Sequence, residues 1–234
     1  MEKTILSIET SGKVCGVALA TFNTFSDALR FELIAEYSIN IGNKHDKFCA
    51  ELCNRILKDN NYNVLNIDAV AVSIGPGSFT GLRIGVAIAK GICFSDAQIL
   101  DNKIPLIAVP TLAAMANNDI SIANLYNENV KILAIIPSHN NLVYHQLFDK
   151  NGEQLSAIEL IDLDLLSQKY SSDTNIIITT NSPIDIKFGN YIPILSSISA
   201  TSIAKLGAKM YSNNELTNSI DIQPLYIQDF LIKK

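Results

Sequence analysis

A glycine-rich segment that follows an apolar run is the first candidate for chemistry in this sequence. Residues 75–81 read Gly-Pro-Gly-Ser-Phe-Thr-Gly, and we predict a tight turn with positive φ at Gly77 and a helix capped by Ser78 or Thr80. A helix N-terminus offers free amide donors that can hold an anion such as phosphate. Gly75, Gly77, Ser78 and Thr80 are therefore candidate anion contacts. Because no Walker lysine follows, the glycines could equally serve only close packing of a strand on a helix.

Other residue types that carry chemistry do not gather into a recognisable site. His139 and His145 are six residues apart, and no His-x-x-x-His pair or companion carboxylate stands at ligand spacing, so the pattern predicts no metal site. No Gly-x-Ser-x-Gly nucleophile elbow is present, and we predict no catalytic residue. Cys49 and Cys53 stand at helical spacing, and we expect all four cysteines to be reduced and buried. Such cysteines are typical of a cytoplasmic protein.

The composition describes an apolar chain that is neither basic nor disordered. Of 234 residues, 48% are hydrophobic and 18% are charged, and the formal net charge is −5. Nucleic-acid-binding proteins usually carry a basic face, because neutralising phosphates supplies much of their affinity. This chain is therefore a poor candidate for holding nucleic acid alone. No apolar run reaches the roughly 20 residues that span a bilayer, and we expect no secretory signal.

Hydrophobic periodicity divides the chain into strands and helices. In the first half we predict strands over 4–8, 14–20, 31–39, 69–74 and 104–109, a loop over 21–29, and helices over 44–58 (capped by Asn43), 82–94 and from 111. In the second half we predict a hairpin of 131–136 and 142–148, helices over 162–170 (capped by Asp162) and 199–211, a strand over 175–179 and an extended or edge segment over 222–227. We divide the chain into domains 1–108 and 109–234, with a last helix and tail that can pack back on the first domain. No internal repeat is evident.

Three strands followed by helix, strand and helix differ from the doubly wound dinucleotide-binding order, in which a helix directly follows the first strand. The order instead resembles half of an actin-like or sugar-kinase-like ATPase (ASKHA, ribonuclease H-like). We therefore expect an α/β fold of two half-domains, each with a mixed sheet and helices. In those ATPases the first hairpin turn grips phosphates and begins with aspartate. Glu9 stands there in this chain, so that Glu9, Thr10 and Ser11 are either weak nucleotide contacts or an ordinary turn.

The predicted helix after the glycine-rich turn is apolar on nearly every side. Gly81, Gly85 and Ala89 lie four apart on one face, which would permit close approach of another helix, and Ile84 and Ile88 help to cover the other directions. A helix that is apolar all round must be buried on all sides. One side can face the sheet. The other needs a second domain, a partner protein or neighbouring elements of the same chain.

Residues 73–91, the most specific part of the sequence, closely resemble the bacterial TsaB (YeaZ) proteins. The opening Ile-Leu-Ser-Ile-Glu-Thr-Ser of residues 5–11 resembles their first strand and turn, and Lys44-His45-Asp46 resembles the start of their first helix. Residues 109–112 and 224–227 resemble later segments. The resemblance implies an actin-like fold and a role in forming threonylcarbamoyladenosine beside the tRNA anticodon.

The resemblance also implies partners and a surface for them. It implies a non-catalytic subunit that pairs with and activates TsaD, the subunit that transfers the threonylcarbamoyl group, while the ATPase TsaE joins the pair. It further implies that this chain contacts tRNA only as part of the complex, and that it does not bind a membrane. We expect the isolated chain to be a homodimer without a cofactor of its own, and any weak ATP or ADP contact to lie at the TsaD interface. The expected partner surface comprises His45, Phe48, Cys49, Leu52, Gly81, Arg83, Ile84, Gly85, Ile88 and Ala89.

One segment departs from that family. Where the family carries Asp-Ala-Arg-x-x-Glu-Val-Tyr, residues 137–144 read Pro-Ser-His-Asn-Asn-Leu-Val-Tyr, so the three charged residues are absent. The alternative to a scaffold subunit is a free-standing actin-fold kinase or ATPase that acts on a small metabolite. Glu9 in place of aspartate argues against that alternative, as does the lack of a clear Gly-Gly turn for adenosine in the second half.

Overall fold

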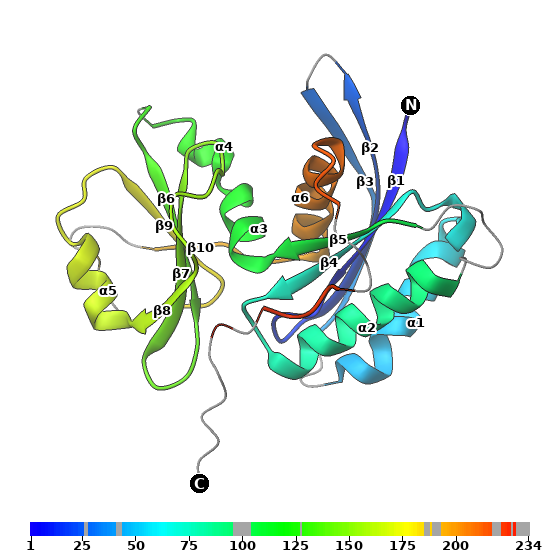
Figure 1. Ribbon diagram of the computed structural model, residues 1–234, viewed down its shortest axis with the longest axis horizontal. Helices are drawn as coiled ribbons and strands as arrows, with labels where there is room; N and C mark the ends of the chain where they lie inside the picture. The colour runs from blue at the N-terminus through cyan, green and yellow to red at the C-terminus, as the bar shows by residue number, and fades with distance from the viewer. Residues whose placement is uncertain are drawn as a thin grey trace, which may run out of the picture. The chain divides into compact units, whose positions relative to one another are not determined.

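The computed structural model describes residues 1–25, 28–40, 44–95, 104–126, 128–184, 188, 193–216, 221–225 and 227. The chain forms two compact units (Figure 1). The first comprises Met1–Thr111 and Ile198–Pro224, and the second comprises Leu112–Ser197 and Leu225–Lys234. The sequence places the domain boundary after residue 108, and in the structure the first stretch of the first unit ends at Thr111. Within the described residues, no helix has the length and apolar character needed to cross a membrane.

The first unit is built on a mixed sheet with the strand order β3-β2-β1-β4-β5. Its strands are β1 (Lys3–Glu9), β2 (Cys15–Phe25), β3 (Ala28–Ile39), β4 (Ala69–Gly75) and β5 (Leu106–Pro110). β2 is antiparallel to both β1 and β3, whereas β4 is parallel to both β1 and β5. Every residue of β4 is buried, as is typical of a strand whose two faces are both covered.

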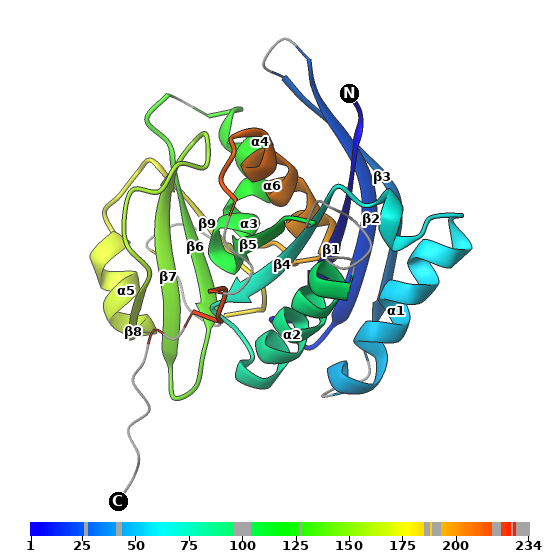
Figure 2. The ribbon, with the colours of Figure 1, turned by 45° about the vertical axis from the view of Figure 1, so that its right-hand side comes forward.

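Helices cover both faces of this sheet (Figures 1 and 2). α1 (His45–Asp59) and α2 (Phe79–Ser95) lie side by side over one face and close the larger apolar core there. α6 (Ala200–Ser212) lies on the opposite face. Its Gly207 approaches the sheet so closely that an added Cβ would stand 2.7 Å from the Cβ of Ala71. Glycine lowers helix propensity at this position, but it allows α6 to pack on the sheet.

The predicted loop over residues 21–29 is wrong in part, because β2 continues to Phe25 and β3 begins at Ala28. The strand continues because Phe22 is buried, and its ring packs edge-on against that of Tyr211 in α6 with centroids 5.4 Å apart. The polar residues around Phe22 hid this strand in the sequence. Asn43, the predicted cap of α1, lies outside the described residues, and Lys44 occupies the N-cap position.

The second unit repeats the topology of the first without a sequence repeat. Its sheet has the order β10-β9-β6-β7-β8. The strands are β6 (Lys131–Pro137), β7 (Leu142–Asp149), β8 (Glu159–Asp162), β9 (Ile176–Thr180) and β10 (Ile194–Leu195). As around β1, the two strand pairings on one side of β6 (β6 with β7, β7 with β8) are antiparallel, and the two on the other side (β6 with β9, β9 with β10) are parallel. β8 and β10, with four and two residues, are too short for periodicity to reveal.

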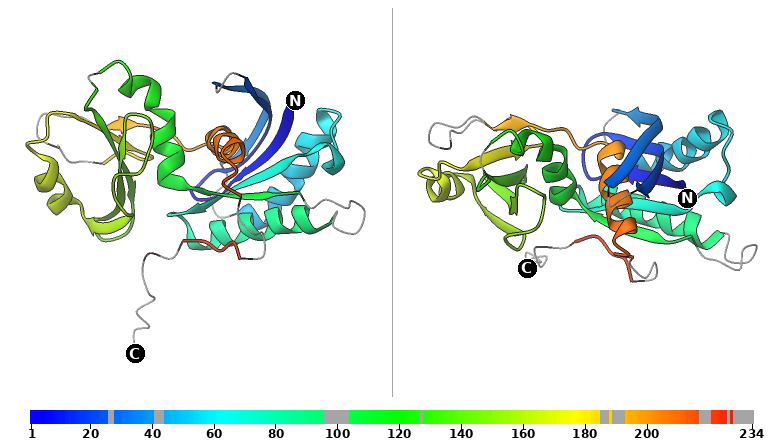
Figure 3. Two further views of the ribbon diagram at one scale, coloured as in Figure 1. Left: turned by 45° about the horizontal axis from the view of Figure 1, so that its top comes forward. Right: turned by 90° about the horizontal axis from the view of Figure 1, so that it is seen from above.

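The remaining helices are α3 (Thr111–Asn118), α4 (Ile120–Ala123) and α5 (Leu163–Tyr170), and α5 packs against β8 (Figure 3). Asp162 caps α5 as predicted, because its Oδ1 accepts from Asp164 N at 2.9 Å. The segment that departs from the family forms the turn between β6 and β7. Asn141 in that turn donates from Nδ2 to both Asp162 and Asp164, which ties the hairpin to α5. Residues 222–225 form no strand.

Candidate functional site

The turn after β1 packs directly against the start of α2. Ser78 N donates to Ser11 O at 2.7 Å, and Thr10 N donates to the Oγ of Ser73, near the end of β4, at 3.3 Å. Gly81 N in turn donates to Ser78 Oγ at 3.3 Å. The structure therefore brings together the two turns that the sequence singled out separately.

Close packing, not an unusual backbone, explains most of the glycines in this segment. An added Cβ at Gly77 would stand 2.5 Å from Ser11 O, and an added Cβ at Gly81 would meet the Thr10 carbonyl oxygen even more closely. The expected positive φ at Gly77 is wrong, because it occurs at Gly75, where φ is 108°. Gly75 N also donates to Thr111 Oγ1 at 3.1 Å, which links β4 to the start of α3.

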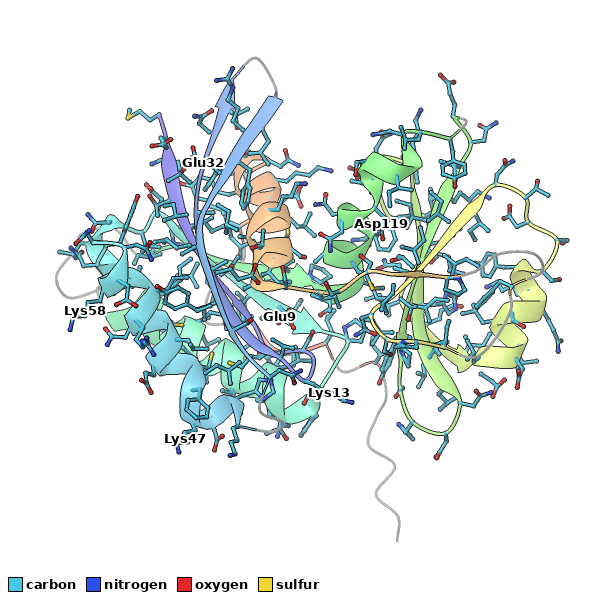
Figure 4. The ribbon with its side chains drawn as sticks, turned by 180° about the vertical axis from the view of Figure 1, so that it is seen from behind. Glu9, Lys13, Glu32, Lys47, Lys58 and Asp119 are labelled. Atoms are coloured by element: carbon cyan, nitrogen blue, oxygen red, sulfur yellow. The ribbon has the colours of Figure 1, made fainter. Side chains whose placement is uncertain are left out.

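Glu9 is a buried carboxyl at the end of β1 (Figure 4). Its Oε1 accepts from Ser11 N at 2.6 Å and from the Ser11 hydroxyl, whereas its Oε2 has no partner among the described residues. Burial raises the pKa of Glu9 to about 7, against the opposing effect of hydrogen bonds from Ser11, Ser73 and Gly12. Among the described residues no cation forms an ion pair with this carboxyl, so its charge offers a phosphate no attraction.

The predicted anion contacts thus converge, but the chain itself occupies two of the donors that would hold an anion. Ser78 N and Gly81 N both bond to oxygen atoms of the protein. A weak nucleotide contact at this place therefore stays a prediction. It concerns Glu9, Thr10, Ser11, Gly75, Gly77, Ser78 and Thr80.

Six of the ten residues expected at a partner surface lie inside the first unit instead. Gly81 and Gly85 of α2 face the chain's own turn, since an added Cβ at either would collide with an atom of Thr10. On α1 the buried residues repeat at three-four spacing and face the sheet. The expectation is therefore wrong for His45, Cys49, Leu52, Gly81, Gly85 and Ala89.

The other four expected residues remain accessible on α1 and α2. Arg83 is exposed, and Phe48, Ile84 and Ile88 are half-buried. Arg83 also covers the exposed ring of Phe79, with its guanidinium carbon 3.6 Å from the ring centroid.

Two further residues, Ala87 and Gly91, are exposed on the same side of α2 and were missed by the sequence reasoning. They stand three and seven residues after Ile84, which is same-face spacing. Placing Gly81, Gly85 and Ala89 on the inner side of α2 would have identified Ala87 and Gly91 as residues of its outer side. We call Arg83, Ile84, Ala87, Ile88 and Gly91 the outer face of α2.

The four cysteines are free and buried, as predicted. The Cys15 thiol on β2 lies beside Cys49 of α1, which in turn lies beside Cys53. Burial raises the pKa of Cys93 to about 12. Within the described part of the chain, no three histidine, cysteine or acidic side chains are placed to share a metal ion.

Comparison with known proteins identifies the family. The model of a family described as "TsaD: tRNA N6-adenosine threonylcarbamoyltransferase" matches residues 33–177. The chain belongs to this family. It is similar to the tRNA threonylcarbamoyladenosine biosynthesis protein TsaB of Buchnera aphidicola (subsp. Baizongia pistaciae), with 32% identity over 64% of this chain and 60% of that protein. It is 33% identical to Escherichia coli TsaB over 63% of this chain and 57% of that protein. The chain thus spans about three-fifths of the length of the curated relatives it matches.

The same family includes proteins named for the transferase itself. One of these, the tRNA N6-adenosine threonylcarbamoyltransferase of Ehrlichia canis, is 28% identical over 67% of this chain and 47% of that protein. Among solved structures, YeaZ from Pseudomonas aeruginosa superimposes with a TM-score of 0.72 over 96% of this chain and 99% of that chain. At 18% identity this likeness shows the fold. The expected actin-like fold and the resemblance to TsaB (YeaZ) proteins are confirmed.

Proposed function

We propose that this TsaD-family chain is a TsaB-type accessory subunit in the formation of threonylcarbamoyladenosine in tRNA. It pairs with TsaD and activates it, and the transfer of the threonylcarbamoyl group takes place on TsaD. The observation that carries this proposal is the outer face of α2. Two isoleucines, an alanine and a glycine occupy one accessible side of a helix whose other side already packs on its own sheet.

The chemistry of the outer face suits a protein partner. Ala87 and Gly91 have little or no side chain, so a second helix can approach α2 closely between Ile84 and Ile88. Burying the half-exposed isoleucines removes apolar surface from water, which favours association. Arg83 at one end supplies a charged rim, as is common around apolar interface centres.

The geometry of the first turn supports a non-catalytic role. In the actin-like ATPases that this fold resembles, the corresponding turn grips phosphates. Here two amides at the start of α2 already donate hydrogen bonds to Ser11 O and Ser78 Oγ, and the Glu9 carboxyl is buried. The proposal has further parts. TsaE joins the pair, and tRNA binds to the complex instead of to this chain alone. The isolated chain forms a homodimer through the outer face, and the assembly is cytoplasmic.

A matched pair of substitutions tests the proposal. Ala87→Glu places a carboxylate at the centre of the outer face, and Ala157→Glu makes the same change at an exposed position of the second unit. Isothermal titration with TsaD from the same organism should show at least about tenfold weaker binding for Ala87→Glu, because an unpaired charge is costly to bury. Ala157→Glu should bind like the wild type. Circular dichroism confirms that both variants fold.

Two results would contradict the proposal. One is wild-type affinity of the Ala87→Glu variant for TsaD, which would place the partner elsewhere. The other is threonylcarbamoyl transfer to tRNA by the purified chain in the absence of TsaD. Tight magnesium-dependent binding of ATP by the isolated chain, measured by the same titration method, would favour a free-standing kinase or ATPase.

A further inference from the structure

A small pocket lies in the first unit, between the turn after β1 and the start of α1. It encloses about 170 Å³ of space, part of it open to solvent. Two of its lining residues are lysines and one is a histidine, and no lining residue is acidic. The lining comprises Lys13, Cys15, Ile39, Lys44, His45 and Phe48.

His45 is the most informative residue of this pocket. Its side chain is 5% exposed, and Nε2 is buried without a hydrogen-bond partner among the described residues. Buried polar atoms in proteins are nearly always hydrogen-bonded, because an unpaired one loses its water without compensation. His45 Nε2 is therefore available to a group that the chain itself does not supply.

The electrostatics of the pocket favour a negatively charged group. Lys44 occupies the N-cap of the 15-residue helix α1, and its own side chain forms no capping hydrogen bond there. The free amides and the dipole of such a helix end add positive potential. Neither Lys13 nor Lys44 forms an ion pair within the described part of the chain. Two acidic residues oppose this potential. Glu9 acts on the lining residue Cys15, although Ser11 already occupies one of its carboxyl oxygens, and Asp46 stands in the first turn of α1 beside His45.

We propose that this pocket binds an oxyanion, either a carboxylate or a phosphate group. Lys13 approaches it from the turn, Lys44 and the amides of α1 approach it from the helix start, and His45 donates a hydrogen bond from Nε2. Ile39 and Phe48 form the apolar wall. The part of the pocket that admits a water-sized group measures only about 10 Å³, so one oxygen atom of the anion can enter it while the rest of the anion lies at the open mouth. The inference does not depend on the proposed pairing with TsaD.

The test uses the full chain and follows the histidine ring signals by NMR during titration. The probes are sodium phosphate and sodium acetate, each balanced with sodium chloride to hold the ionic strength constant. His45→Asn assigns the His45 signal by its loss. We expect that signal to move with a saturable dependence on the anion, while the signal of the exposed His139 stays in place.

Lysine variants then locate the charge without disturbing the core. The double variant Lys13→Gln/Lys44→Gln should weaken anion binding by about tenfold or more, because hydrogen bonds to charged groups contribute that much. Lys58→Gln is the matched control, because Lys58 lies at the far end of α1, away from Lys13 (Figure 4). It should bind like the wild type.

The two probes distinguish the sources of the oxyanion. Saturation with phosphate alone supports a phosphate or phosphoryl group, and saturation with acetate supports a carboxylate. A His45 signal that moves with neither anion would overturn the proposal. So would a response that is the same in the double variant as in Lys58→Gln.

Discussion

Replacing Gly81 with alanine creates its most severe clash between α2 and the turn after β1. The added Cβ would stand closer than 3.0 Å to the carbonyl oxygen of Thr10. That oxygen belongs to backbone, so a side-chain rotation cannot relieve the clash. Nor can the turn move freely, because Thr10 N bonds to Ser73 Oγ and Ser11 O accepts from Ser78 N.

Two opposing effects set the size of the change in the free energy of unfolding. Alanine favours a helix over glycine by about 0.5–1 kcal/mol. Overpacking a well-filled site costs about 1–3 kcal/mol, and the fixed backbone at Thr10 places Gly81→Ala at the upper end. We expect a net destabilisation of about 2 kcal/mol, or a fall in Tm of about 4–8 °C for a chain of this length.

Gly91 provides the control within the same helix. An added Cβ at Gly91 meets no atom within 4 Å, so Gly91→Ala should gain the helix propensity alone and raise stability by about 0.5–1 kcal/mol. Urea unfolding followed by circular dichroism measures both changes, and an unchanged m-value shows that the unfolding transition is comparable. Gly81→Ala at or above wild-type stability would refute the placement of the turn against α2.

Three further predictions concern Glu9, the cysteines and α5. Because burial raises the pKa of Glu9 to about 7, the folded state holds this proton more tightly than the unfolded chain does. The stability of the wild type should therefore fall as pH rises from about 4.5 through about 7, and Glu9→Gln should gain about 3 kcal/mol relative to it across that window in urea unfolding. All four thiols are buried, so Ellman's reagent should label none promptly in the native protein and all four in urea. Asp162→Ala should destabilise the second unit by about 1 kcal/mol through loss of the α5 cap, whereas Asp162→Asn should retain most of that stability.

The periodicity of the sequence predicts most of the helices and strands close to where they occur. α5 begins after its predicted cap Asp162, and α6 begins after Ser199, because a side-chain oxygen that accepts from the first turn leaves a local signature. Strand β4 follows from its continuous apolar run. These features depend on neighbours in the sequence, which is why the sequence alone reveals them.

Features that depend on distant contacts were missed. The extension of β2 rests on Phe22 meeting Tyr211, which is far away along the chain. The close approach of Gly207 to Ala71 likewise joins α6 to a strand from the first half. Neither pairing has a local signal, and polar residues around Phe22 gave the appearance of a loop.

The orientation of α2 shows how the same limit affects the functional site. A helix with apolar residues on nearly every side has no periodic signal that separates its core face from its partner face. Small residues are compatible with either, because they permit close approach of a helix or of a turn. In this chain the turn after β1 takes that place, since Thr10 fills the space left by Gly81 and Gly85. Because one side of α2 is committed to the turn, a partner can reach only the opposite side. Ile84, Ala87, Ile88 and Gly91 therefore become the residues on which the proposed pairing with TsaD depends.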